Sequence, residues 1–109
     1  MPKCPDLTPA ELRVMKALWE LGPASVTEVR AELATRGHEV AYTTVMTLLG
    51  RLEKRGCVAR RKPGRSYIYR PKLSRDTLRE RAVKRLVQEF FDGAADALQR
   101  YLREPRAKI

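Results

Sequence analysis

The segment from residue 42 to 55 carries two kinds of side chain at helical spacing. Val45, Leu48, Leu49 and Leu52 recur at i, i+3, i+4 and i+7, which predicts a helix with one apolar stripe. The other side carries Tyr42, Thr43, Thr44, Thr47 and Arg51, and continues through Lys54 and Arg55. Threonine hydroxyls can bond phosphates or base edges, and an arginine can reach a guanine or a phosphate. This pattern predicts a helix that contacts nucleic acid; the alternative is a solvated helix face.

A basic hairpin is expected directly after this helix. Residues 57–62 and 66–70 alternate like two strands around a Pro-Gly-Arg turn at 63–65. The candidate DNA contacts here are Arg60, Arg61, Lys62, Arg65 and Tyr67. Such a wing can lie along the DNA backbone or enter the minor groove, whereas the alternative is charge that protects an edge strand. We expect Ile68 to pack with Val58 in the core and Tyr69 to point to the opposite face.

The charge of the chain is concentrated around these two elements. The formal net charge is +10, and residues 51–85 hold fourteen Lys and Arg against three Asp and Glu. The rest of the chain holds nine against ten. A field of this kind attracts a polyanion, of which nucleic acid is the usual soluble example.

Two further helices are expected before residues 42–55. Thr8 with Glu11, and Ser25 with Glu28, each have the spacing of a capping box that opens a helix. Three helices followed by a hairpin is the order of a winged helix-turn-helix. We therefore predict a mainly α fold with a small β-hairpin, in which residues 7–72 form a winged-helix DNA-binding domain.

Residues 74–104 predict a helical arm that is interrupted at Asp92-Gly93. Its apolar band is wider than a single contact stripe, so a second copy of the same arm is the simplest cover and would give a twofold homodimer. The alternative is packing back on the first helix beside Trp19. The candidate dimer surface comprises Leu78, Ala82, Leu86, Val87, Phe90, Phe91, Leu98 and Leu102.

Several classes of function find no support in the residue pattern. His38 is the single histidine, and no nucleophile–base set, phosphate loop or metal-ligand spacing occurs, so we expect no enzyme, cofactor or metal site. Cys4 and Cys57 lie far apart in the sequence and are interpreted as reduced thiols. Met1-Pro2-Lys3 opens no signal peptide and no run is long enough for a membrane helix, so a cytoplasmic location without membrane contact is expected.

The chain resembles the penicillinase-repressor (BlaI/MecI/CopY) family. The resemblance rests on LTPAELRVMKALW at 7–19, TTVMTLLGRLEKRG at 43–56, GRSYIYRP at 64–71 and FFDG at 90–93. It implies a winged-helix domain, a C-terminal dimerisation region and repression by operator binding. It also implies contacts from Thr43, Thr44, Thr47 and Arg51, with the wing at residues 60–67.

Two branches of that family each have a characteristic feature that this chain lacks. The copper-responsive branch resembles it but carries a cysteine-rich metal motif, which Cys4 and Cys57 cannot supply. The β-lactam-responsive branch is released by cleavage at an Asn-Phe bond, where this chain has Arg100-Tyr101.

Two functions from different classes follow from this sequence. The first is a sequence-specific transcriptional repressor that binds a palindromic operator as a homodimer. The second is a winged-helix module that binds RNA, non-specific nucleic acid or a protein partner. Competition between operator and random duplex distinguishes them.

Overall fold

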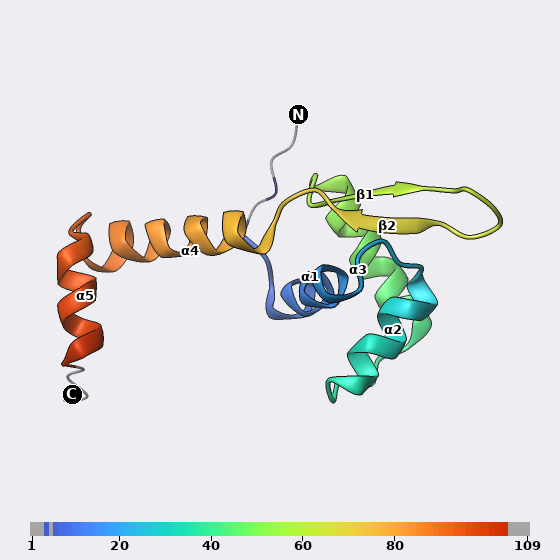
Figure 1. Cartoon of the computed structure of the whole chain (residues 1–109), viewed down its shortest axis with the longest axis horizontal. Coiled ribbons are helices and arrows are strands. Elements are labelled where there is room, and N and C mark those ends of the chain that lie inside the picture. The colour runs from blue at the N-terminus through green and yellow to red at the C-terminus, as the bar shows by residue number, and fades with distance from the viewer. Residues whose placement is uncertain (1–3, 5, 105–109) are drawn as a thin grey trace. The chain divides into compact units, whose positions relative to one another are not determined.

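The computed structural model describes residues 4 and 6–104 (Figure 1). Residues 1–3, 5 and 105–109 lie outside that description, and the expectation about a signal peptide rests partly on them. The elements in chain order are α1 (Pro9–Leu21), α2 (Val26–Thr35), α3 (Tyr42–Lys54), β1 (Val58–Arg61), β2 (Ile68–Pro71), α4 (Arg75–Phe90) and α5 (Ala95–Arg103). Contacts divide the chain into two units, one up to Arg75 and one from Asp76 onward.

The first unit is built on three helices whose starts are fixed by their own residues. Thr8 Oγ1 accepts from the Glu11 amide at 3.2 Å, while the Thr8 amide donates to Glu11 Oε1 at 2.9 Å. Ser25 and Glu28 repeat this capping box at the start of α2. The three helices pack pairwise around a core that includes Val14, Met15, Leu18, Val29, Leu33, Val45, Leu49 and Leu52. Both predicted capping boxes and the apolar stripe of α3 are therefore confirmed.

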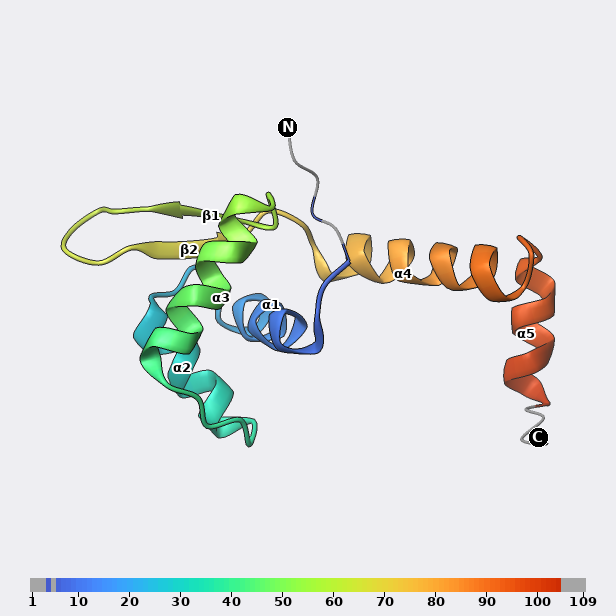
Figure 2. The same ribbon diagram turned by 180° about the vertical axis from the view of Figure 1, so that it is seen from behind.

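A two-stranded antiparallel wing follows α3. Val58 pairs with Pro71 and Arg61 with Ile68, so the strands are shorter than predicted and residues 62–67 form the connecting loop. The α1–α2 connection adds a bridge to β2, because Ala24 and Tyr69 exchange two backbone hydrogen bonds of 2.9 and 2.8 Å. This bridge attaches the hairpin to the helices. Figure 2 shows that the hairpin extends beyond α1, α2 and α3. The mainly α winged-helix fold with a β-hairpin is confirmed.

The expected orientation of Ile68 and Tyr69 is wrong. Tyr69 is only 2% exposed and lies in the core with Val58, whereas Ile68 is half-buried. The reason is strand register: Arg60 lies opposite Tyr69, and residues two apart share a face. Val58, Arg60 and Tyr69 therefore share one face, and Ile68 lies on the other.

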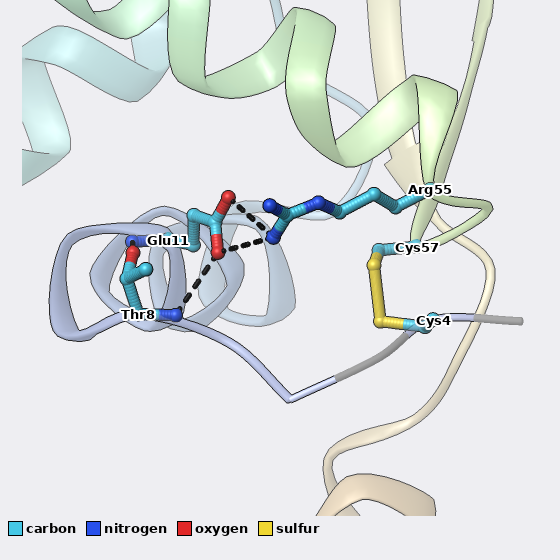
Figure 3. A network of polar contacts seen from close by, with 5 residues as sticks. All are labelled: Cys4, Thr8, Glu11, Arg55 and Cys57. Atoms are coloured by element: carbon cyan, nitrogen blue, oxygen red, sulfur yellow. Dashed lines mark hydrogen bonds and ion pairs between the residues drawn. A yellow bond between two sulfur atoms is a disulfide. The ribbon is translucent and has the colours of Figure 1, made fainter.

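A disulfide between Cys4 and Cys57 corrects the interpretation of both as reduced thiols (Figure 3). The two residues are 53 positions apart in sequence, yet their Cα atoms lie 4.7 Å apart. The fold brings them together because the segment before α1 passes the junction between α3 and β1. Sequence separation alone gave no sign of this contact.

The second unit consists of α4 and α5. Asp92 and Gly93 both have positive φ, 51° and 84°, and reverse the chain between the helices. The Phe91 and Tyr101 rings pack with their centroids 5.8 Å apart. Among the described residues of this unit, Val87 is the one buried side chain. The predicted interruption at 92–93 is confirmed.

Candidate nucleic-acid interface

The outward side of α3 presents the residues that the sequence assigned to DNA contact. Tyr42 is 44% exposed, and Thr43, Thr44, Thr47 and Arg51 are also exposed. The opposite side is closed, because its four predicted apolar residues are buried. Thr47 Oγ1 donates to the Thr43 carbonyl at 2.9 Å, so in this position its hydroxyl is oriented to accept a bond from a ligand.

Met46 lies on the same outward side and was not among the predicted contacts. It is 46% exposed, and it stands one turn from Tyr42 along the helix. Its spacing from Tyr42 places it on that side, but an apolar side chain gives no polar signal of DNA contact in the sequence. An exposed thioether on a helix otherwise lined by hydroxyls offers an apolar contact such as a thymine methyl.

A groove joins this side of α3 to the wing. It is lined from α2 by Ser25, Val26 and Thr27, from α3 by Tyr42 and Met46, and from the hairpin by Lys62, Arg65, Ser66, Tyr67 and Tyr69. The first turn of α2 therefore faces the same space as two wing cations. Helix N-termini and cations both favour phosphate groups. The groove combines apolar contact surface from α3 with positive charge from the wing.

Tyr67 organises the cations of the wing. The Arg60 guanidinium lies 4.2 Å from the centre of the Tyr67 ring and Lys62 Nζ lies 5.2 Å from it. Tyr67 and Tyr69 form a tilted ring pair with centroids 6.4 Å apart. A hydrogen bond with the Tyr69 side chain raises the pKa of Arg60 above its ordinary value, although the guanidinium is charged at physiological pH with or without this shift. Tyr67 is thus a platform for two cations.

Arg61 lies on the other face of the hairpin. It lines a shallow hollow with Pro23, Ala59, Ile68 and Arg70, which Arg60 also borders. The five wing residues predicted from the sequence are therefore divided between two faces. Lys62, Arg65 and Tyr67 face the groove toward α3, whereas Arg61 does not line it.

The cations of this surface share one property, which is that none has an ion-pair partner among the described residues. Within the described part of the chain, no ion pair engages Arg51, Arg60, Arg61, Lys62 or Arg65. Elsewhere, Arg36 pairs with Glu32 and Arg79 with Asp76. Charge that the protein itself leaves uncompensated remains available to an external anion.

Arg55 does not belong to the outward surface on which the sequence placed it. Its Nη1 atom donates to both carboxylate oxygens of Glu11 at 2.9 Å (Figure 3). Glu11 is 1% exposed, so the pair anchors the end of α3 to the start of α1. Arg55 is the C-cap residue of α3, where the helix ends and the chain turns toward its core.

Across residues 4 and 6–104, no group of three or more His, Cys, Asp or Glu side chains is placed to hold a metal ion. None of the helices described there has the length and apolar character needed to cross a bilayer.

The sequence of this chain matches a known protein family. The sequence profile of the family described as "Penicillinase repressor" matches residues 7–107, almost the whole chain. The chain belongs to the penicillinase repressor family. It is accordingly a DNA-binding transcriptional repressor with a winged-helix fold, and not an enzyme.

Individual relatives agree with this assignment. The penicillinase repressor of Bacillus licheniformis is 30% identical over 98 residues, covering 90% of this chain and 76% of that protein. The transcriptional regulator BlaI of Mycobacterium tuberculosis is 34% identical, covering 98% of this chain and 90% of that protein. The solution structure of B. licheniformis BlaI in monomeric form with the blaP half-operator matches with a TM-score of 0.57 and 34% identity, covering 70% of this chain and 92% of that one.

Proposed function

We propose that this penicillinase-family repressor binds a twofold-symmetric operator as a homodimer, with α3 in the major groove and the wing on the adjoining backbone. The observation that carries the proposal is the continuity of the outward side of α3 with the groove lined by Lys62 and Arg65. Cations that form no ion pair with a described acidic residue border a helix surface of short, exposed side chains. That combination suits close approach to a duplex.

The proposed contacts fall into two groups. On α3, Thr43, Thr44, Met46, Thr47 and Arg51 face base edges, with Tyr42 at the helix start. On the wing, Lys62 and Arg65 contact phosphates, and Arg60 is held for the same purpose by Tyr67. The relative from B. licheniformis binds a half-operator in its monomeric form, which supports one winged helix for each half-site.

The proposed dimer contact lies on the second unit, at residues 74–104. Phe90 is 73% exposed and Leu102 66% exposed, and Ala82 and Leu86 are exposed on the same helices. Of the other predicted residues, Val87 is buried within the unit, and Leu78, Phe91 and Leu98 are half-buried. A nine-residue helix such as α5 is marginal in water without tertiary contacts, and no residue of α5 is buried. A second copy that covers these side chains would supply the missing contacts.

A repressor of this kind acts where chromosomal DNA is found, so we place the chain in the cytoplasm with operator DNA and a second copy of itself as partners. Selection of bound duplexes from a random pool tests the proposal. The expected product is an inverted repeat whose half-sites lie about one or more helical turns apart. Recovery of unrelated sequences, or equal binding of structured RNA, would instead favour a general nucleic-acid module.

The salt dependence of operator binding tests the role of the wing. Replacing Lys62 and Arg65 together by alanine should reduce the slope of log K against log salt by about two, since each phosphate contact contributes about 0.9. The double variant Arg36→Ala with Arg79→Ala removes the same charge from two ion-paired positions and should leave the slope unchanged. Equal slopes for the two double variants would remove the wing pair from the interface.

A further inference from the structure

We propose that the Cys4–Cys57 disulfide is a thiol–disulfide exchange site through which a small or protein-borne dithiol controls operator binding. The disulfide form is the one that binds, and the dithiol form is the one that releases. The inference rests on the proposed function, because it concerns the regulation of the same DNA-binding surface. It starts from the position of Cys57.

Cys57 lies where both DNA-contacting elements meet. It follows the C-terminus of α3 and immediately precedes β1. Its amide donates to the Leu52 carbonyl at 2.8 Å, and its carbonyl accepts from the Lys72 amide at 2.9 Å. The end of the recognition helix, the start of the wing and the chain leaving the wing are thus joined at one residue. A covalent bond at this position acts on all three.

Two cross-links tie this junction to α1 and to the segment that precedes it. One is the ion pair between Arg55 and Glu11, and the other is the disulfide from Cys57 to Cys4 (Figure 3). A cross-link spanning 53 residues lowers the unfolding equilibrium constant by about a thousandfold through the entropy of the unfolded chain. Reduction removes this constraint and leaves the ion pair to hold the junction.

Both sulfur-bearing side chains are buried, and Cys4 is the partner nearer to solvent at 6% exposure, so exchange requires a local opening of its segment. Cys4 lies in the segment before α1, where the described residues form no helix or strand, while Cys57 is completely buried. Segments of this kind open locally at low free-energy cost. Disulfides in the reducing cytoplasm are usually transient or sensory, so a repressor that carries one at its DNA-binding junction has the chemistry of a sensor.

The exchange balances without any further reactant. A thiolate of the dithiol attacks Cys4 Sγ, the disulfide bond breaks, and Cys57 leaves with the electron pair and takes a proton. The second thiol of the reductant then displaces Cys4, which also takes a proton. The protein gains two electrons and two protons, and the dithiol becomes a disulfide. The oxidised form of the same reagent class reverses the sequence.

The test uses the full chain, dithiothreitol as the reductant, and three readouts. We expect the number of free thiols per chain to rise from zero to two and the Tm of the winged-helix unit to fall by about 15 °C or more. At an assay temperature between the Tm values of the dithiol and disulfide forms, reduction should lower operator affinity at least tenfold. Cys4→Ser and Cys4→Ala should show the low Tm and weak binding with or without reductant. Their agreement excludes an effect of one particular side chain.

Three outcomes would overturn the proposal. They are a disulfide that resists excess dithiothreitol under native conditions, reduction that changes neither Tm nor affinity, and a Cys4→Ser chain that still responds to the reductant. Failure of the proposed function looks different. In that case neither redox form prefers an operator to random duplex, while the thiol count and the Tm still respond to reduction.

Discussion

Replacing Glu11 by alanine should lower the free energy of unfolding by about 2–3 kcal/mol, because it leaves Arg55 without its partner and removes half of a capping box. The value lies below the full cost of breaking a buried pair because the Arg55 side chain is 40% exposed. Urea unfolding followed by the fluorescence of Trp19, the single tryptophan, measures it.

Two variants separate the components of this effect. Glu32→Ala breaks the exposed pair with Arg36 and should cost about 0.5 kcal/mol or less. Arg55→Ala keeps the capping box but leaves the buried Glu11 carboxylate without its cation, so it should cost nearly as much as Glu11→Ala. If Glu11→Ala and Glu32→Ala cost the same, the anchor between α1 and α3 is not an important source of stability.

Replacing Phe90 by aspartate should give monomers and weaken binding to a full operator by about a hundredfold or more, since two linked half-sites bind with a large effective concentration. Phe90 is 73% exposed, so the charge meets no core within a single copy. It would meet the apolar side chains of a second copy in the proposed dimer. Sedimentation velocity gives the assembly state, and titrations with full and half operators give the two affinities.

The control for this variant lies on the same helix. Gln88→Asp adds the same charge at an exposed position of α4 that is about 200° around the helix from Phe90, and it should leave the dimer intact. Half-operator affinity should be unchanged in both variants. A dimeric Phe90→Asp chain, or equal losses on the half and full operators, would contradict the proposed dimer surface.

Local signals in the sequence predicted the helices well. The capping boxes at Thr8 and Ser25, and the buried stripe from Val45 to Leu52, depend on residues three to seven positions apart, and all are present in the structure. The interruption at Asp92-Gly93 was also predicted from the sequence, because both residues tolerate a left-handed backbone.

The errors concern contacts between distant residues. Arg55 and Glu11 are 44 positions apart in the sequence, and Cys57 and Cys4 are 53 positions apart. No local sequence pattern predicts contacts between residues so far apart in the chain. The core position was assigned to Ile68 when Tyr69 occupies it. This error arose from strand register, since a shift of one residue reverses the two faces of a strand. Met46 was outside the predicted contacts because an exposed methionine carries no polar signal for DNA binding. At the proposed interface, the sequence predicted the contact residues, and the structure shows which face of α3 or of the wing each one occupies.

The competition between operator and random duplex tests the central claim most directly. The assay uses the full chain at physiological salt and a labelled operator selected from a random pool. Unlabelled operator should displace the labelled one at a concentration about a thousandfold lower than scrambled duplex of the same length. Inverting one half-site should abolish most of that preference, because the proposed dimer presents its two copies of α3 with twofold symmetry. Equal competition by scrambled duplex would contradict the account.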